Sequence, residues 1–389
     1  MGALQSLLFG KQKTMEIPEH HIPAQLILFF ILYGGSAMAA VILCVYLLLR
    51  KGNAIAAEIT PPMRLRRWAA AFFGVAALIH VWWLLFYIYS WDFHSVSYAV
   101  VLTLDCVTLP ITIYGTLLSM LQDRERSLWP VFIALIPLVV MELLRIIYPS
   151  MEIVYMGIVY YLSLSVLFTI YIVIAVRQYG RWLRDNYADL EYKEVWLSHM
   201  LIIIFLLFVV VYGFSDYNFV LNYLIHVIAL TLFALLLWRV ETLPKLEVTT
   251  EQQETLCAEH EPAPQAKKSP SLPSDIGQRL AEQCVDTQLY VQHDLTLHQL
   301  AMVLGTNRSY LSQYFSGLGL SFNIYINDLR INHFIRLYQE AVASQRHFTA
   351  QQLASASGYR SYSTFSLAFK QRMGQSVTAW MHDAANQPT

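Results

Sequence analysis

The stretch Thr296–Gly305 reads TLHQLAMVLG and the stretch Thr349–Gly358 reads TAQQLASASG, so both follow the pattern T-x-x-Q-L-A-x-x-x-G. In each copy the Thr is expected to cap a helix by accepting from the backbone N–H three residues on, while the Gln reaches back to the N–H of the Thr. The Leu-Ala pair provides an apolar contact and room for a neighbouring helix, and the Gly ends the helix where a positive φ is needed. The pattern therefore predicts two short, capped helices.

A second helix is predicted directly after each glycine. The first, NRSYLSQYFSG, places Leu311 and Phe315 one turn apart, and the second, SYSTFSLAFKQRMG, spaces Phe365 and Phe369 in the same way. A capped helix, a glycine turn and a second helix with a polar face make a helix-turn-helix unit. The two units are not equivalent, because Leu311 follows its glycine by six residues and Phe365 follows its own by seven.

The segment between the two units, SFNIYINDLRINHFIRLYQEAV, predicts one helix of about 20 residues, which is roughly 30 Å long. Adjacent major-groove faces on one side of DNA lie about 34 Å apart. The separation therefore suits two recognition helices in successive major grooves.

The rest of the chain is far more apolar. The 389 residues are 56% hydrophobic and only 14% charged, which is too apolar for one soluble globule. Several stretches have the roughly 20 residues needed to cross the hydrocarbon core of a bilayer. We expect seven transmembrane helices, at Ile22–Leu49, Trp68–Trp91, Val96–Leu121, Leu128–Tyr148, Ile153–Val176, Val195–Phe214 and Tyr217–Trp238.

Three segments follow from these observations. Residues 1–240 form the membrane part, residues 241–273 form a flexible linker rich in Pro, Glu, Gln and Ser, and residues 274–389 form a soluble domain. No removable signal peptide is expected at the N-terminus. The chain therefore adds a soluble domain to a multi-span membrane protein.

Loop charges predict the orientation. The connections after the first, third and fifth expected spans carry eleven Lys and Arg residues, whereas those after the second, fourth and sixth carry none. Lys and Arg are retained on the cytoplasmic side. This bias outweighs Lys11 and Lys13 near the N-terminus, so the N-terminus is expected outside and the soluble domain in the cytoplasm.

Five polar side chains of the expected spans lie near their outer ends, where such groups are costly and often functional. They are Asp105, Glu142, Arg145, Asn222 and His226. One interpretation is a ligand pocket open to the outside. The other is that Glu142 pairs with Arg145 and the rest bond to neighbouring helices. Both stay open, and His80 is expected to be packed rather than functional.

The sequence contains none of the motifs of a membrane hydrolase, such as H-E-x-x-H or G-x-S-x-G. The four cysteines are isolated and have no spacing typical of metal ligands or disulfides. We therefore expect no enzymatic activity, no cofactor and no metal site.

At its soluble end the chain resembles the AraC family of bacterial transcription regulators. The matching residues are LTLHQLAMVLGTNRSYLSQYF, the pair Leu329-Arg330, and FTAQQLASASGYRSYSTFSLAFKQRMGQSVTAW. The resemblance implies two helix-turn-helix units joined by a long helix, which bind double-stranded DNA in a sequence-specific manner. It does not cover the membrane part, where such regulators usually carry a soluble sensing domain.

The resemblance also implies which side chains face DNA. In the first recognition helix these are Asn307, Arg308, Ser309, Ser312 and Gln313, and in the second they are Arg360, Ser361, Tyr362, Ser363 and Ser366, with Lys370 and Arg372 for phosphates. Gln313 suits an adenine edge, and Arg308 suits guanine or phosphate. From Asp275 onward there are eight basic and seven acidic residues, so non-specific affinity is expected to be weak. Occupancy of DNA is then expected to depend on pairing into a homodimer or on local concentration near the membrane.

Five residues depart from the family pattern. Val377 replaces a usual proline, Trp380-Met381 replaces Tyr-Arg, and Phe334 replaces a small residue. Leu367 occupies an outward position of the second recognition helix where a polar base reader is expected. We therefore assign most sequence reading to the first unit.

Together these patterns predict an all-α protein of the bacterial cytoplasmic membrane: a seven-transmembrane helix bundle followed by a soluble AraC-type domain. The bundle is expected to sense a small-molecule or envelope signal and to control DNA binding as a one-component regulator. Two alternatives stay open. The spans form a transporter with an attached regulatory domain, or the soluble domain is released by proteolysis.

Overall fold

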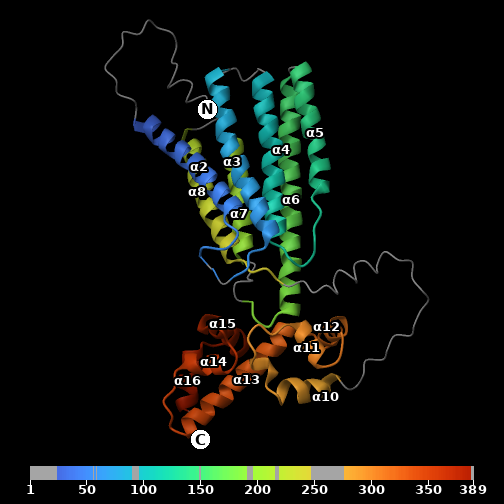
Figure 1. The fold of residues 1–389 in the computed structure, drawn as a ribbon, viewed down its shortest axis with the longest axis vertical. Helices are drawn as coiled ribbons and strands as arrows, with labels where there is room; N and C mark the ends of the chain where they lie inside the picture. Colours follow the sequence, from blue (N-terminus) through green and yellow to red (C-terminus); the bar gives the residue numbers. More distant parts are fainter. Residues whose placement is uncertain are drawn as a thin grey trace, which may run out of the picture. The chain divides into compact units, whose positions relative to one another are not determined.

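The computed structural model describes residues 24–55, 57, 59–89, 96–148, 150–190, 196–214, 219–246 and 276–386. These described residues form helices and contain no strand, which confirms the all-α fold (Figure 1). The chain divides into two compact units. The first contains residues 1–179 and 195–248, and the second contains residues 180–194 and 249–389.

The first unit is built from long apolar helices. They are α2 (Ala24–Leu49), α3 (Met63–Tyr89), α4 (Val96–Ser119), α5 (Trp129–Ile147), most of α6 (Met151–Asn186), α7 (Trp196–Phe214) and α8 (Phe219–Thr242). Among the described residues, six helices are long and apolar enough to cross a membrane: α2, α3, α4, α5, α6 and α8. The sixth expected span, Val195–Phe214, coincides with α7, which has 19 residues, and its crossing stays a prediction.

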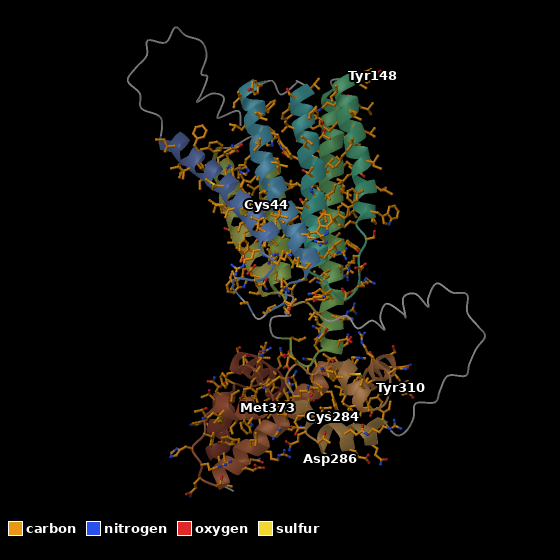
Figure 2. The ribbon with its side chains drawn as sticks, in the orientation of Figure 1. Cys44, Tyr148, Cys284, Asp286, Tyr310 and Met373 are labelled. Carbon is orange, nitrogen blue, oxygen red and sulfur yellow. The ribbon has the colours of Figure 1, made fainter. Side chains whose placement is uncertain are left out.

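The outer faces of these helices carry apolar side chains, as Figure 2 shows. Ile31, Leu48 and Leu167 are each more than 60% exposed. A contiguous exposed apolar surface of this kind is untenable in water and suits a lipid environment. Inside the unit, α4 approaches α3 closely at Gly115, where an added Cβ would lie 2.3 Å from the Trp68 ring.

A buried carboxylate near the end of α8 joins that helix to α2 and α3. Glu241, near the end of α8, accepts from the Tyr46 hydroxyl at 3.0 Å and pairs with Arg66 at 3.4 Å, and both charged groups are 1% exposed. Beyond the helix, Lys245 N donates to the Thr60 carbonyl at 2.8 Å. The first residues of the predicted linker are therefore packed on the unit, and residues 247–275 lie outside the described residues.

The second unit contains the two predicted helix-turn-helix units. Its helices are α10 (Ile276–Leu280), α11 (Leu297–Val303), α12 (Arg308–Gly317), α13 (Phe322–Ala343), α14 (Ala350–Ala356), α15 (Tyr362–Met373) and α16 (Val377–Asn386), with a π-helical turn at Ala281–Val285 and a 3-10 turn at Leu289–Val291. The 22-residue α13 is the predicted linking helix. Leu311 and Phe315 enter one core cluster, and Phe365 and Phe369 enter the other.

Both predicted capping boxes are confirmed. Gln299 N donates to Thr296 Oγ1 at 3.1 Å while Thr296 N donates to the Gln299 side chain at 2.9 Å, and the second copy repeats this at 3.2 and 2.9 Å. Gly305 and Gly358 have φ values of +62° and +98°. These caps define where α11 and α14 begin and end.

The predicted difference between the two helix-turn-helix units is also confirmed. The cap of α12 is Asn307, two residues after Gly305, whereas the cap of α15 is Ser361, three residues after Gly358. The second turn is therefore longer by one residue.

Candidate DNA interface and candidate sensing cluster

A fully buried arginine joins the two helix-turn-helix units. Arg330, in α13, donates from Nε to the Tyr290 carbonyl at 2.7 Å and from Nη2 to the Gln292 carbonyl at 2.8 Å. Its guanidinium lies 5.6 Å from the centre of the Tyr359 ring, which follows the turn of the second unit. The Leu329-Arg330 pair of the sequence thus contributes a structural cation rather than a DNA contact.

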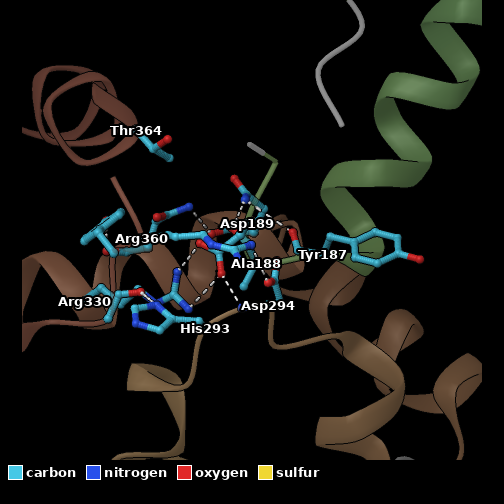
Figure 3. A network of polar contacts seen from close by, with 12 residues as sticks. Tyr187, Ala188, Asp189, His293, Asp294, Arg330, Arg360 and Thr364 are labelled. Atoms are coloured by element: carbon cyan, nitrogen blue, oxygen red, sulfur yellow. Dashed lines mark hydrogen bonds and ion pairs between the residues drawn. The ribbon is translucent and has the colours of Figure 1, made fainter. Parts of the chain in front are cut away.

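The carboxylate that neutralises this cation comes from the chain segment after α6 (Figure 3). Asp189 accepts from Arg330 at 2.6 Å, with side chains 5% and 0% exposed, and also from the Asp294 backbone N–H at 2.7 Å. Beside it, Ala188 N donates to the Leu295 carbonyl at 3.0 Å, and Ala188 lies in the first core cluster. The expected domain of residues 274–389 therefore packs together with a segment from between two expected spans.

The first recognition helix, α12, presents a mixed face. Ser309 and Gln313 are exposed and Ser312 is half-buried. Asn307 is the helix cap and accepts from Tyr310 N at 2.7 Å. Arg308 donates from Nε to Asn186 Oδ1 at 2.7 Å. Of the five expected DNA-facing residues, Asn307, Ser309 and Gln313 are thus exposed, and Asn307 already uses its side chain as the helix cap.

The second recognition helix, α15, is more apolar at its surface. Ser361 is the cap, accepting from Thr364 N, and Tyr362 packs on Phe365 with ring centres 5.8 Å apart. Ser363 is exposed and Ser366 is half-buried. Leu367 is 55% exposed, as its outward position predicts.

Two of the cations expected at the DNA interface, Arg360 and the phosphate-facing Arg372, pair within the domain. Arg360 lies 3.1 Å from Asp294, and Arg372 lies 2.8 Å from Asp328 on α13. Lys370 is exposed. Because both ion pairs are largely exposed, each stabilises the domain by only about 0–1 kcal/mol and leaves the cation free to exchange for a phosphate.

The departures from the family pattern compensate one another. Phe334 packs on Phe365 with ring centres 4.5 Å apart and on Trp380 at 6.3 Å. Val377, at the start of α16, is 1% exposed, and Ser376 before it accepts from Ala379 N at 3.2 Å. The large rings therefore fill one core, and α16 begins without the usual proline.

These helices, their caps and their order identify the type of domain. Residues 300–383 match the family model described as a helix-turn-helix domain. They form an AraC-type helix-turn-helix domain. The matched range includes both recognition helices and Arg330. No curated protein and no solved structure matches the chain.

In the first compact unit, the expected pocket residues have polar partners. Asp105 accepts from the Trp82 and Trp83 indole N–H groups at 2.7 and 2.6 Å. Glu142 and Arg145 pair at 2.8 Å within α5. These contacts agree with the interpretation that the groups satisfy one another and their neighbours.

His226, another of the five expected pocket residues, belongs to a hydrogen-bonded cluster that was not predicted from the sequence. The Ser36 hydroxyl, on α2, lies 2.9 Å from His80 Nε2 on α3 and 3.0 Å from His226 Nδ1 on α8. The Tyr33 hydroxyl donates to the His80 carbonyl at 2.6 Å. The fifth residue, Asn222, is buried one turn before His226 on α8. The Ser36 hydroxyl thus connects three helices. His80 is hydrogen-bonded within this cluster as well as packed.

Three further features of the described residues concern possible binding and reactive groups. A cavity between α4, α5, α6 and α7 is lined mainly by apolar and aromatic side chains, and its hydroxyl-bearing residues are Tyr114, Tyr161, Ser165 and Thr169. None of the five expected pocket residues lines it. The described part of the chain has no group of three or more His, Cys, Asp or Glu side chains placed to bind a metal. Burial raises the pKa of Cys284 to about 11, so this thiol is an unreactive core group.

Proposed function

We propose that this protein is a membrane-embedded, one-component transcription regulator, in which a change in the helix bundle alters DNA binding by the AraC-type domain. The observation that carries the proposal is the presence, in one chain, of an AraC-type helix-turn-helix domain and six membrane-capable helices. The eleven loop cations favour a cytoplasmic location for the domain. No separate kinase or cofactor is needed in this scheme.

The first helix-turn-helix unit, which contains α12, reads most of the DNA sequence. The exposed Ser309 and Gln313 support this assignment, because the corresponding surface of α15 includes the apolar Leu367. A glutamine bonded bidentately to adenine contributes about 1–3 kcal/mol of discrimination against the wrong base.

The experiment uses the full chain in lipid nanodiscs. Its genomic binding sites are mapped, and affinity for one site is measured at fixed salt. Gln313→Ala is expected to weaken binding about 10-fold and to relax preference at one base pair. Gln339→Ala is the matched control, because Gln339 is exposed on α13 outside the recognition helices. Failure of the full chain to footprint any site, even at low salt, would refute direct regulation.

The sensing part of the proposal rests on the bonded cluster of α2, α3 and α8. Ser36→Ala removes the hydroxyl that connects His80 and His226, so it is expected to change the response of a target-promoter reporter. Thr231→Ala on α8 is the control, since that exposed hydroxyl bonds only to the Val227 carbonyl of its own helix. Equal reporter responses in the two variants would remove the cluster from the signalling route.

A further inference from the structure

The end of α6 is part of the DNA-binding unit. Residues 180–194 belong to the second unit, although α6 is one uninterrupted helix from Met151 to Asn186. A bilayer crossing needs about 20 residues, and α6 has 36. Asp189 and Ala188 then fix the following segment to the domain through the buried contact with Arg330 and the backbone bond to Leu295.

The last residue of α6 connects that helix to the first recognition helix. Asn186 Nδ2 donates to the Trp182 carbonyl at 2.6 Å, and its Oδ1 accepts from Arg308 Nε at 2.7 Å. Asn186 is 8% exposed. Because the amide donates on one side and accepts on the other, its orientation is determined by the last turn of α6.

This bond competes with DNA for the same guanidinium. Arginine binds guanine or phosphate through two parallel N–H donors at one edge. While Arg308 Nε donates to Asn186, the edge that contains Nε is not free for such a bidentate contact. Arg308 is the first residue of α12 and one of the residues expected to face DNA.

We propose that Asn186 is a positioning residue that keeps Arg308 from DNA while the bond between Asn186 and Arg308 is present. A rearrangement of the last turn of α6 breaks this bond and lets Arg308 contact DNA. The Asp189–Arg330 pair keeps the segment attached to the domain in both forms. This inference rests on the proposed function, and it names α6 as the route by which the bundle acts on DNA binding.

The test measures the affinity of full-length protein in nanodiscs for a mapped DNA site at one salt concentration. Asn186→Ala removes the acceptor of Arg308 Nε and is expected to tighten binding about 3- to 10-fold, the net effect of one typical hydrogen bond. Asn186→Asp replaces the neutral acceptor by a carboxylate, which strengthens the bond to Arg308 and is expected to weaken DNA binding by a similar factor. Unchanged affinity in both variants, or weaker binding by Asn186→Ala, overturns the inference.

An Arg308→Ala background separates this mechanism from a general charge effect. In that background both Asn186 substitutions are expected to leave the affinity unchanged. If Asn186→Asp still weakens binding there, simple repulsion between the new carboxylate and DNA explains the result and the inference is overturned. If the unaltered chain binds no DNA, the proposed function fails and this inference with it, whereas DNA binding that ignores Asn186 overturns the inference alone.

Discussion

Replacing Asp189 by Asn is expected to destabilise the DNA-binding unit strongly. The Asp189 carboxylate lies 2.6 Å from Arg330, and the two side chains are 5% and 0% exposed. Asn is nearly the same size, so the substitution removes the charge without opening a cavity. It leaves a buried guanidinium without its counter-ion. In either orientation, the amide NH2 group that replaces one carboxylate oxygen faces a donor, because both oxygens of Asp189 accept hydrogen bonds. Removing one partner of a buried pair typically costs about 3–5 kcal/mol.

The control residue is Asp294, whose backbone N–H donates to Asp189. Asp294 pairs with Arg360 at 3.1 Å, but these side chains are 49% and 59% exposed. An exposed pair contributes only about 0–1 kcal/mol. Asp294→Asn therefore changes charge in the same way at a nearby position, and it should cost several-fold less than Asp189→Asn.

Hydrogen exchange of the full-length protein in nanodiscs measures both variants. Amides of α13, whose core residues include Ile326 and Phe334, report opening of the second unit. We expect their opening free energy to fall by about 3–5 kcal/mol in Asp189→Asn. A fall of less than about 1 kcal/mol, or one equal to that of Asp294→Asn, would show that the segment after α6 is not part of the folded domain.

Other substitutions give three independent predictions. Gly358→Ala is expected to destabilise the compact DNA-binding unit more than Gly305→Ala does. Both glycines have positive φ, but only at Gly358 would a Cβ lie 2.8 Å from backbone atoms. The unfolding temperatures of the two variants test this. Burial lowers the pKa of His333, so the unfolded state binds its proton more readily. Stability is expected to fall by up to about 1.4 kcal/mol per pH unit below about 6.5, and His333→Gln should flatten that slope in unfolding measured against pH. Glu241→Gln leaves Arg66 buried without a counter-ion and should lower the free energy of unfolding by about 3–5 kcal/mol. The measurement is a lower unfolding temperature of the first compact unit in detergent.

Local chemistry made much of the DNA-binding unit predictable. A Thr followed three residues later by Gln, and then by a correctly spaced Gly, has few alternatives to a capped helix, so α11 and α14 begin and end where expected. The one-residue difference between the turns was also visible, because Leu311 and Phe365 lie at different distances from their glycines. The apolar stretches likewise became helices α2 to α8.

Long-range contacts were not predictable from the sequence. Asp189 and Arg330 are 141 residues apart, and Asp189 lies in a polar loop that looks solvated. Ser36 is an ordinary residue of a transmembrane stretch until the fold brings two histidines to it. Periodicity and capping describe neighbours along the chain, whereas these contacts depend on which distant segments pack together.

The discontinuous DNA-binding unit bears on how the regulator works. A protease cutting between residues 246 and 276 would separate the covalent chain, but Asp189 would remain on the membrane side of the cut. The fragment would still be bound through Arg330, and on leaving it would carry a buried guanidinium without its carboxylate, which is strongly destabilising. Release by proteolysis is therefore disfavoured, and control through α6 with the domain still attached is favoured. An immunoblot should accordingly find only full-length protein while target genes respond, and a responding cell that accumulates the free fragment would contradict this argument.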